Sequence, residues 1–134
     1  MSLMINIDVP DLDAGVRFYT EAFGLSVGRR FGTGFAELLG WPIKLYLLTK
    51  APGTVGAGGD LRRYDRHWTP VHPDIDVDDV DAAVARAVGA GAVLEAAARD
   101  APYGRIAMLA DPFGHGFCLV QFNERGYDAL LNAD

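Results

Sequence analysis

The strongest constraint on how this chain can fold is an internal repeat. Residues 7–16 (IDVPDLDAGV) match residues 75–84 (IDVDDVDAAV) at seven of ten positions, with a constant offset of 68. Two copies are too few for a solenoid, which needs at least about three repeats. Because the whole chain has 134 residues, an ordinary size for one domain, the repeat predicts a pseudo-symmetric pair of modules that share one core or sheet.

Each copy opens with a predicted strand in which apolar and polar residues alternate with a period of two. This alternation places the apolar residues on one face and the polar set on the other. Pro73 has no N–H to donate, so we expect the second of these strands to be an edge strand or irregular there. The polar faces comprise Met4, Asn6 and Asp8 in the first copy and His72, Asp74 and Asp76 in the second.

A helix is predicted after each of these strands. Asp11 and Asp79 are suited to accept hydrogen bonds at the helix N-terminus, and Gly24 and Gly91 stand where a left-handed C-terminal residue is expected. Helical spacing predicts the core-facing stripes. These are Leu12, Val16, Tyr19 and Phe23 in the first copy, and Val80, Val84, Ala87 and Val88 in the second.

Three further strands, separated by turn-forming residues, are expected in each copy. In the first copy they cover about 25–31, 35–39 and 43–49, and in the second about 92–98, 105–110 and 116–122. Each copy is therefore a βαβββ module, and the predicted fold class is α+β.

The predicted organisation is a single domain over residues 4–122. Module one covers 4–49, a Gly-rich linker 50–66, and module two 67–122. The remaining tail, 123–134, is expected to carry a short helix whose apolar contacts are Tyr127, Leu130 and Leu131.

Composition limits the partners and the compartment. The net charge of −6 argues against a nucleic-acid or anionic-membrane surface, either of which needs a basic footprint. No apolar run approaches the roughly 20 residues of a membrane helix, and the N-terminus lacks the basic-then-apolar pattern of a signal peptide. Cys118 is the only cysteine, so no intramolecular disulfide can form. We therefore expect a cytoplasmic protein.

Two motifs carry a family resemblance. The segment 8–14 (DVPDLDA), followed by Phe18-Tyr19 and Phe23-Gly24-Leu25, is similar to the opening of the vicinal oxygen chelate superfamily, also called glyoxalase/bleomycin resistance/dioxygenase. The segment 111–119 (DPFGHGFCL) is similar to its final hairpin. The resemblance runs from Met4 to Phe122 and implies paired βαβββ modules whose curled mixed sheets surround a cavity, in a chain that forms homodimers.

The resemblance also implies four positions for the ligands of a divalent metal. They fall on Met4 and His72 of the first strands and on Tyr46 and Cys118 of the last strands. Only His72 keeps the expected type, since both expected glutamates are absent, and we expect no metal cofactor. A soft set of Met4, His72 and Cys118, suited to copper(I) or zinc, is the alternative, with His72 and Cys118 as its stronger members.

Several other side chains are candidates for a small-molecule site. His72 is a candidate general base or a satisfied polar residue, and Glu37 is a candidate acid or base that could equally face solvent. Trp41, Tyr46, Tyr64 and Trp68 could stack on a flat ligand or pack in the core. His115 is expected to be exposed in a turn. The expected ligand-binding set is Met4, Asn6, Tyr46, His72, Asp74, Cys118, Trp41 and Trp68.

Three functional hypotheses remain. The first is a metal-independent protein that binds or sequesters a small organic molecule, as in the bleomycin-resistance branch. The second is a lyase, isomerase or ring-cleaving dioxygenase that uses a divalent metal at a rearranged site around His72. The third is a non-catalytic accessory or regulatory domain. Whether the chain is an enzyme is left open by the sequence.

Overall fold

The computed structural model of the protein describes residues 1–131, so the last three residues of the expected tail lie outside the described residues. Contacts between Cα atoms divide the chain into two compact units, Met1–Asp65 and Arg66–Asp134. Within residues 1–131, no helix combines the length and the apolar character needed to cross a membrane.

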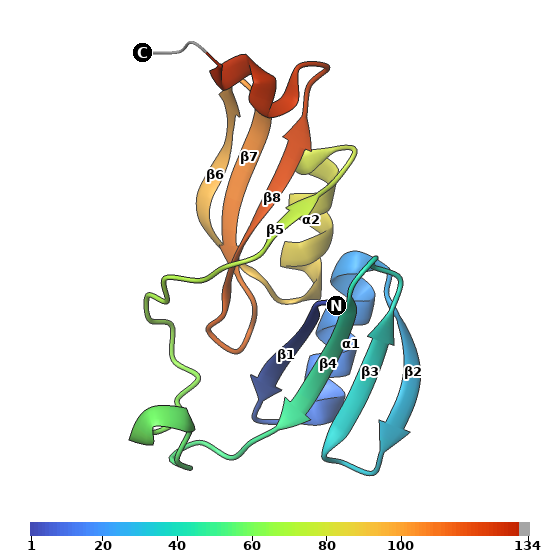
Figure 1. The fold of residues 1–134 in the computed structure, drawn as a ribbon, viewed down its shortest axis with the longest axis vertical. Helices are drawn as coiled ribbons and strands as arrows, with labels where there is room; N and C mark the ends of the chain where they lie inside the picture. Colours follow the sequence, from blue (N-terminus) through green and yellow to red (C-terminus); the bar gives the residue numbers. More distant parts are fainter. Residues whose placement is uncertain (132–134) are drawn as a thin grey trace. The chain divides into compact units, whose positions relative to one another are not determined.

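Unit 1 contains one βαβββ module. Its sheet has the strand order β1-β4-β3-β2, in which β1 pairs in parallel with β4 and the other pairs are antiparallel (Figure 1). The elements are β1 (Met4–Val9), α1 (Leu12–Phe23), β2 (Ser26–Phe31), β3 (Phe35–Leu39) and β4 (Lys44–Thr49), followed by the short 3₁₀ turn η1 (Ala57–Gly59).

Unit 2 repeats this topology with the order β5-β8-β7-β6, again with a parallel first pair. Its elements are β5 (Asp74–Asp76), α2 (Val80–Ala90), β6 (Val93–Ala101), β7 (Gly104–Ala110), β8 (Gly116–Phe122) and the 3₁₀ turn η2 (Gly126–Leu130). The prediction of two tandem βαβββ modules with mixed sheets is confirmed. β5 is an edge strand that starts directly after Pro73, also as predicted.

The helix ends follow the expected chemistry. Asp11 accepts a hydrogen bond from the Ala14 N–H at 2.8 Å, and Asp79 accepts one from Ala82 at 3.0 Å. These carboxylates bond N–H groups that have no partner within the helix. Gly24 ends α1 with φ 68° and Gly91 ends α2 with φ 119°. Only glycine adopts such angles without strain, so the chain turns into the next strand there.

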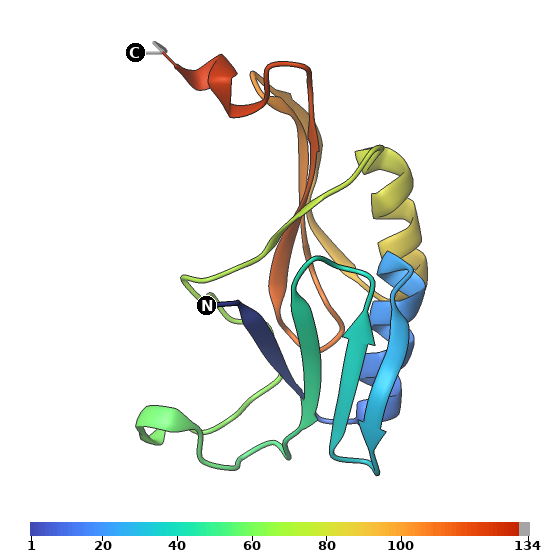
Figure 2. The ribbon, with the colours of Figure 1, turned by 45° about the vertical axis from the view of Figure 1, so that its right-hand side comes forward.

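The helix of each unit covers one face of its own sheet and leaves the other face without a helix (Figures 1 and 2). The predicted core stripes are partly wrong. In α2, Val88 is 44% exposed, and in α1, Val16 and Phe23 are only half-buried. The fully buried positions are Leu12, Gly15, Phe18, Tyr19 and Ala22. A Cβ at Gly15 would lie 3.2 Å from the side chains of Val9 and Leu47. Because glycine has no Cβ, the helix packs closely against the sheet at this position, and the side of the helix that carries Gly15 faces the sheet.

Residues 50–65, most of the expected linker, form a folded loop within unit 1. Arg62 pairs with Asp8 of β1 at 2.8 Å and donates to the Val55 carbonyl. The Tyr64 hydroxyl donates to the carbonyl of Lys50 at 2.6 Å. Val55 and Leu61 form a β-bridge across the loop. A charged side chain and local backbone pairing therefore tie this Gly-rich stretch to the first strand of the unit.

Candidate functional site

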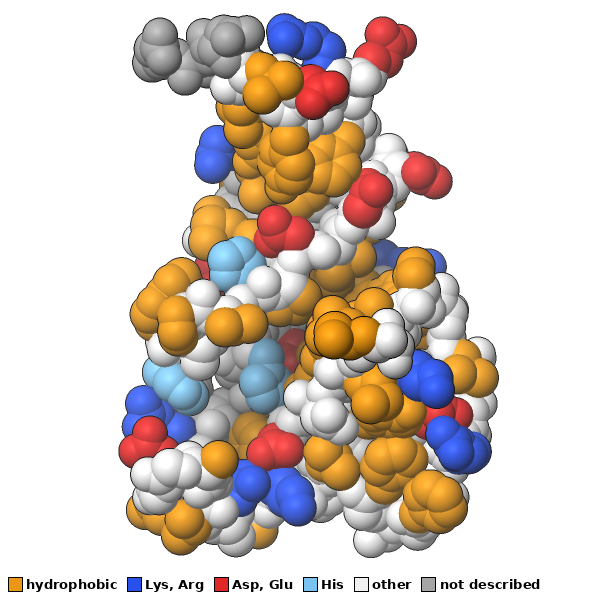
Figure 3. Space-filling model, viewed as in Figure 1, with side chains coloured by type: hydrophobic (Ala, Val, Ile, Leu, Met, Phe, Trp, Pro, Cys, Tyr) orange, Lys and Arg blue, Asp and Glu red, His pale blue; other side chains and the backbone are white. Residues whose placement is uncertain are grey.

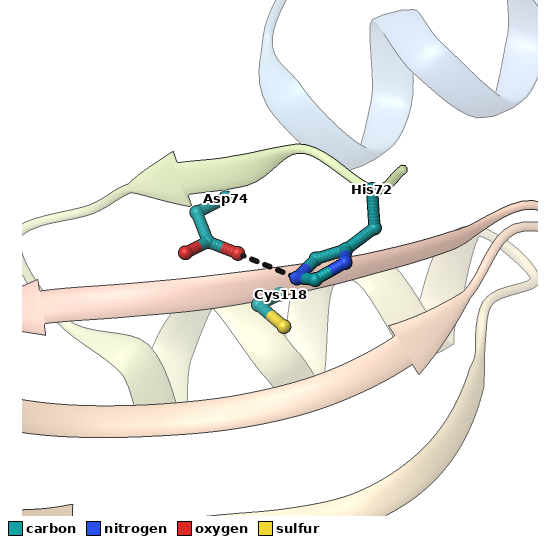
Figure 4. Close-up of side chains that lie close together, drawn as sticks. All are labelled: His72, Asp74 and Cys118. Atoms are coloured by element: carbon teal, nitrogen blue, oxygen red, sulfur yellow. Dashed lines mark ion pairs between the residues drawn. The ribbon is translucent and has the colours of Figure 1, made fainter. Parts of the chain in front are cut away.

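His72, Asp74 and Cys118 converge in unit 2 (Figure 4). Asp74 opens β5, and its Cα partner in the parallel ladder is Cys118 of β8. His72 precedes β5 by two residues, and its Nε2 lies 3.4 Å from the Asp74 carboxylate. The candidate ligand atoms of all three side chains lie within 4.8 Å of one another.

The cluster lies on the sheet face that α2 leaves open. Gln121 of β8 accepts a hydrogen bond from the first residue of α2, Val80, so the odd-numbered residues of β8 face the helix. Side chains alternate along a strand, so Cys118 points to the opposite face. Met108 of β7 is the Cα partner of Cys118 and lies on the same open face.

A pocket within unit 2 adjoins this cluster and is lined by His72 and Cys118 but not by Asp74. Apolar and charged groups share its lining, which includes Arg66, Trp68, His72, Glu95, Met108 and Cys118. Trp68 is 70% exposed, and its ring centroid lies 6.4 Å from that of His72. The sequence-predicted residues His72, Asp74, Cys118 and Trp68 are thus brought together in one unit.

Arg66 borders the pocket and is held in place by Glu95. Two nitrogens of its guanidinium reach the two carboxylate oxygens of Glu95 at 2.7 and 2.9 Å, a bidentate geometry. Glu95 accordingly raises the pKa of Arg66, and Arg66 lowers the pKa of Glu95. A Cβ at Gly116 would stand 2.7 Å from the Arg66 side chain, so glycine at this position makes room for the pair.

The Cys118 thiol is protonated at neutral pH. Burial, followed by the nearby Asp74 carboxylate, raises the pKa of Cys118 from 9.0 to about 11. The side chain is almost fully buried, whereas those of His72 and Asp74 are 39% and 43% exposed. The two polar groups are therefore accessible to a ligand, and the thiol forms the floor beneath them.

Unit 1 has different chemistry at the equivalent positions. Asn6 and Tyr46 are Cα partners on β1 and β4, the same relationship that Asp74 and Cys118 have in unit 2. Tyr46 is buried and stacks against Phe35 at 5.1 Å. Met4 is 52% exposed. Unit 1 therefore offers an amide, a phenol and a thioether where unit 2 offers a carboxylate, a thiol and an imidazole.

Glu37 is a buried ion-pair partner. The expectation that it could face solvent is wrong, because the residue is only 7% exposed. Arg29 binds both of its carboxylate oxygens, at 3.2 and 2.7 Å. Hydrogen bonding to Arg29 lowers the pKa of Glu37 despite burial. A carboxylate stabilised in this way is a weaker base than a free one.

Two other residues singled out in the sequence, Trp41 and His115, have structural contacts of their own. Trp41 packs against Phe23 of α1, with ring centroids 5.4 Å apart. His115 was expected to be exposed but is half-buried, and its Nδ1 lies 2.7 Å from Asp111. Asp111 also accepts hydrogen bonds from the Phe113 and His115 N–H groups, so this pair holds the β7–β8 turn together.

Sequence reasoning missed an aromatic cluster at the far end of the open face. Tyr103, Phe122 and Tyr127 contact one another, with ring centroids 4.9 to 6.3 Å apart. Alternation along β8 places Phe122 on the Cys118 face, which was a usable signal. No local pattern, however, joins Tyr103 in the β6–β7 turn to Tyr127 in the tail.

The chemical nature and spacing of the three candidate ligand atoms in unit 2 limit which metal ion they could bind. A tetrahedral zinc ion with bonds of about 2.0 to 2.3 Å needs ligand atoms roughly 3.3 to 3.8 Å apart. The 3.4 Å between His72 and Asp74 matches this spacing. One imidazole, one carboxylate and one thiol suit a borderline ion such as zinc and are too few oxygens for a hard cation. Zinc binding would require Cys118 to lose its proton, which its raised pKa opposes.

Two mixed-sheet βαβββ modules and a polar cluster on an open sheet face define a glyoxalase-like protein. The family model described as a glyoxalase-like domain matches residues 4–120. The chain therefore belongs to the glyoxalase-like family within the vicinal oxygen chelate superfamily, and the resemblance noted in the sequence is confirmed.

The chain is also similar to known proteins and solved structures. The uncharacterized protein Mb0911c of Mycobacterium bovis is 31% identical over 90% of this chain and 82% of its own length. The anthracycline biosynthesis protein DauV of a Streptomyces species is 31% identical over 90% of this chain, which spans 41% of DauV. A glyoxalase/bleomycin resistance protein/dioxygenase family enzyme from Burkholderia phytofirmans has the same fold, with a TM-score of 0.69, 21% identity, and coverage of 90% of this chain and 97% of its own.

Proposed function

We propose that this protein binds a small organic molecule on the open sheet face of unit 2, at the site formed by His72, Asp74 and Cys118, and that binding needs no metal. The observation that carries the proposal is the pocket itself, in which accessible polar groups stand among apolar side chains. Ligand sites generally combine apolar walls with a few convergent polar groups that fix the ligand's orientation.

The residues of the cluster and the neighbouring Trp68 each have a role in this proposal. His72 and Asp74 offer a hydrogen-bonding pair at the surface, with Nε2 and the carboxylate 3.4 Å apart. Trp68 offers an exposed ring beside His72. The protonated thiol of Cys118 acts as a small apolar group. The DauV relationship supports a small organic molecule as the ligand class, since that protein is named for anthracycline biosynthesis.

The second candidate function is that of a metal-dependent lyase, isomerase or dioxygenase. It is favoured by the three ligand atoms within 4.8 Å. A bound zinc-type ion would supply Lewis-acid polarisation of a substrate oxygen. His72, Asp74 and a deprotonated Cys118 would hold it, and Trp68 would shield one side of the bound substrate.

The experiment that tests the proposal compares metal-free and metal-loaded protein. Protein stripped with a chelator is screened by thermal shift against a panel of small anionic, neutral and cationic organic compounds. We expect saturable binding by the stripped protein, weakened at least about tenfold in His72→Ala. Phe31→Ala, which alters an exposed residue in unit 1, is the matched control and keeps full affinity.

Two outcomes would overturn the proposal. One zinc per chain by mass spectrometry, lost in His72→Ala together with all compound binding, would contradict metal-independent binding and favour the second candidate, for which substrate turnover is then measured. If neither the metal-free nor the metal-loaded protein binds any compound, small-molecule binding is ruled out as the function of this site. The His72→Ala chain itself is expected to keep its melting temperature, because His72 is exposed and contributes nothing to the apolar core.

We also propose that the protein forms homodimers and works in the cytoplasm. The family resemblance supports the dimer, and the lone buried thiol is compatible with a reducing compartment. Light scattering coupled to size exclusion measures the mass directly, and a single peak at 14.4 kDa, the mass of one chain, would contradict the dimer.

A further inference from the structure

The aromatic cluster of Tyr103, Phe122 and Tyr127 lies at one end of the open face of unit 2. The Phe122 and Tyr127 rings meet edge-on, with centroids 4.9 Å apart, and Tyr103 lies 5.2 Å from Tyr127. Tyr127 is nevertheless 54% exposed and Phe122 37% exposed. Figure 3 shows hydrophobic side chains gathered over this end of β6 to β8, beside the terminal turn. The cluster thus presents ring surface to a ligand as well as packing on itself.

The backbone around the cluster is fixed by Asn123. Its side-chain amide donates to the carbonyl of Pro102 at 2.8 Å, and its backbone N–H donates to the carbonyl of Tyr103. Its side-chain oxygen accepts from the N–H groups of Arg125 and Gly126, both at 3.0 Å. One residue therefore ties the tail to the β6–β7 turn. Rings held in advance lose less freedom when a ligand binds.

The cluster and the polar site share one face. Cys118 and Phe122 are four residues apart on β8, so both point to the open side. The surroundings of Tyr127 agree with this placement, because burial, Asp74, Tyr103 and Cys118, in that order, raise its pKa. The Asp74 carboxylate is therefore near enough to Tyr127 to act on it electrostatically.

Carboxylates border the cluster on the β5 side. Asp74 and Asp76 alternate with Ile75, so both lie on the open face, and both are exposed. Arg105, on β7, is directed instead to Asp81 and Asp100, with which it forms ion pairs. The chain as a whole carries a net charge of −6. A positive charge on a ligand would therefore be attracted to this edge of the cluster.

We propose that Tyr103, Phe122 and Tyr127 form an aromatic wall that binds the ring of a flat, cationic aromatic ligand, whose positive charge is met by Asp74 and Asp76. This inference deepens the proposed function, on which it rests, by naming the ligand class. Aromatic faces attract both flat rings and cations, and adjacent carboxylates add charge complementarity.

The test uses proflavine, a flat cationic dye, with 9-anthracenecarboxylate as an anionic compound of similar shape. Fluorescence titration of the full chain is expected to show saturable proflavine binding at least about tenfold tighter than that of the anion. Tyr127→Ala is expected to weaken proflavine binding about threefold to tenfold, whereas Tyr127→Phe, which keeps the ring, stays within about twofold of wild type. Asp74→Asn with Asp76→Asn should remove most of the preference for the cation.

Equal affinity for the two dyes, or unchanged proflavine affinity in Tyr127→Ala, would overturn the aromatic-cation inference. Phe31→Ala, an exposed aromatic of unit 1, controls for nonspecific loss of ring surface. If proflavine does not bind but another compound binds in a His72-dependent manner, the inference fails while the proposed function stands. If no compound of any charge binds, both fail.

Discussion

Asp74 and Cys118 are Cα partners in the parallel ladder of β5 and β8, at the position where Asn6 and Tyr46 are partners on β1 and β4. The repeat has therefore kept the backbone register and changed the chemistry on it. Only in unit 2 does this register place a carboxylate above a buried thiol, with His72 beside both. The two modules are alike in fold and different in the ligands they can bind.

The raised pKa of Cys118 predicts a stability loss at alkaline pH. A folded pKa of about 11 lies above the ordinary value of 9.0, so the thiol contributes stability that is fully present below about pH 9 and is lost as the pH rises towards 11. We expect wild type to lose about 1 to 3 kcal/mol more than Cys118→Ala over that interval, since one pKa unit corresponds to about 1.4 kcal/mol. Urea unfolding at several pH values measures this, and parallel curves for the two proteins would contradict it.

The Arg29–Glu37 pair predicts sensitivity to acid. The pKa of Glu37 is lowered, chiefly by hydrogen bonding to Arg29, so its contribution to stability is present above the ordinary value of 4.5 and is lost as the pH falls below it. In Glu37→Gln, stability should depend less steeply on pH between about 5 and 3. Thermal melts across this range provide the measurement. If Glu37→Gln loses as much stability in acid as wild type does, the Arg29–Glu37 pair contributes no measurable free energy to folding.

Replacing either of two glycines by alanine adds one methyl group, and we expect the two replacements to change the stability of the fold in opposite directions. In Gly104→Ala the new Cβ would stand 1.9 Å from the Gln121 carbonyl oxygen, at φ 148°, so we expect a loss of at least about 3 kcal/mol. In Gly89→Ala, inside α2, the Cβ meets nothing within 4 Å, and we expect a gain of about 0.5 to 1 kcal/mol from helix propensity. Chemical denaturation of both variants checks the pair, and equal stabilities would refute the backbone geometry.

The loop from Lys50 to Arg62 should open when its anchor is removed. Arg62 holds the loop through Asp8 and the Val55 carbonyl, so Arg62→Ala is expected to speed proteolytic cleavage between residues 51 and 61 about tenfold. Global stability should fall by no more than about 1 kcal/mol, because partly exposed ion pairs contribute little. Arg63→Ala, which removes an exposed residue 3.9 Å from Asp65, is the control and should be cleaved at the wild-type rate.

Most of the fold was predictable because its signals are local. The strand ranges expected from alternation and turn residues agree with the observed ones to within one residue at nearly every end, the exception being β6, which continues to Ala101. The stripe of α1 was predicted less well, because close packing at Gly15, and not the count of large apolar residues, sets which side faces the sheet. Because glycine has no apolar side chain, the hydrophobic pattern of the sequence could not show that Gly15 lies on the side of α1 that faces the sheet.

The candidate site was only partly predictable. His72 and Asp74 could be predicted because both lie on the polar face of the expected strand that opens the second copy, and Cys118 could be predicted from the family resemblance. The partner of Glu37 was not, because Arg29 lies eight residues away on another strand, and the bulge in β2 that brings it there has no sequence signature. Tyr127 was recognised only as an apolar contact of the tail.

The sequence by itself determined the repeat, the order of the elements, the helix ends and the family. Each depends on spacing, capping or turn chemistry over a few residues, where the energies are local. Only the tertiary structure decided that Glu37 is neutralised by Arg29, that Asp74 faces Cys118, and that Tyr103, Phe122 and Tyr127 meet. Those relationships join residues on different strands and turns, and they exist only because pairing of the strands sets the register in which distant side chains share a face.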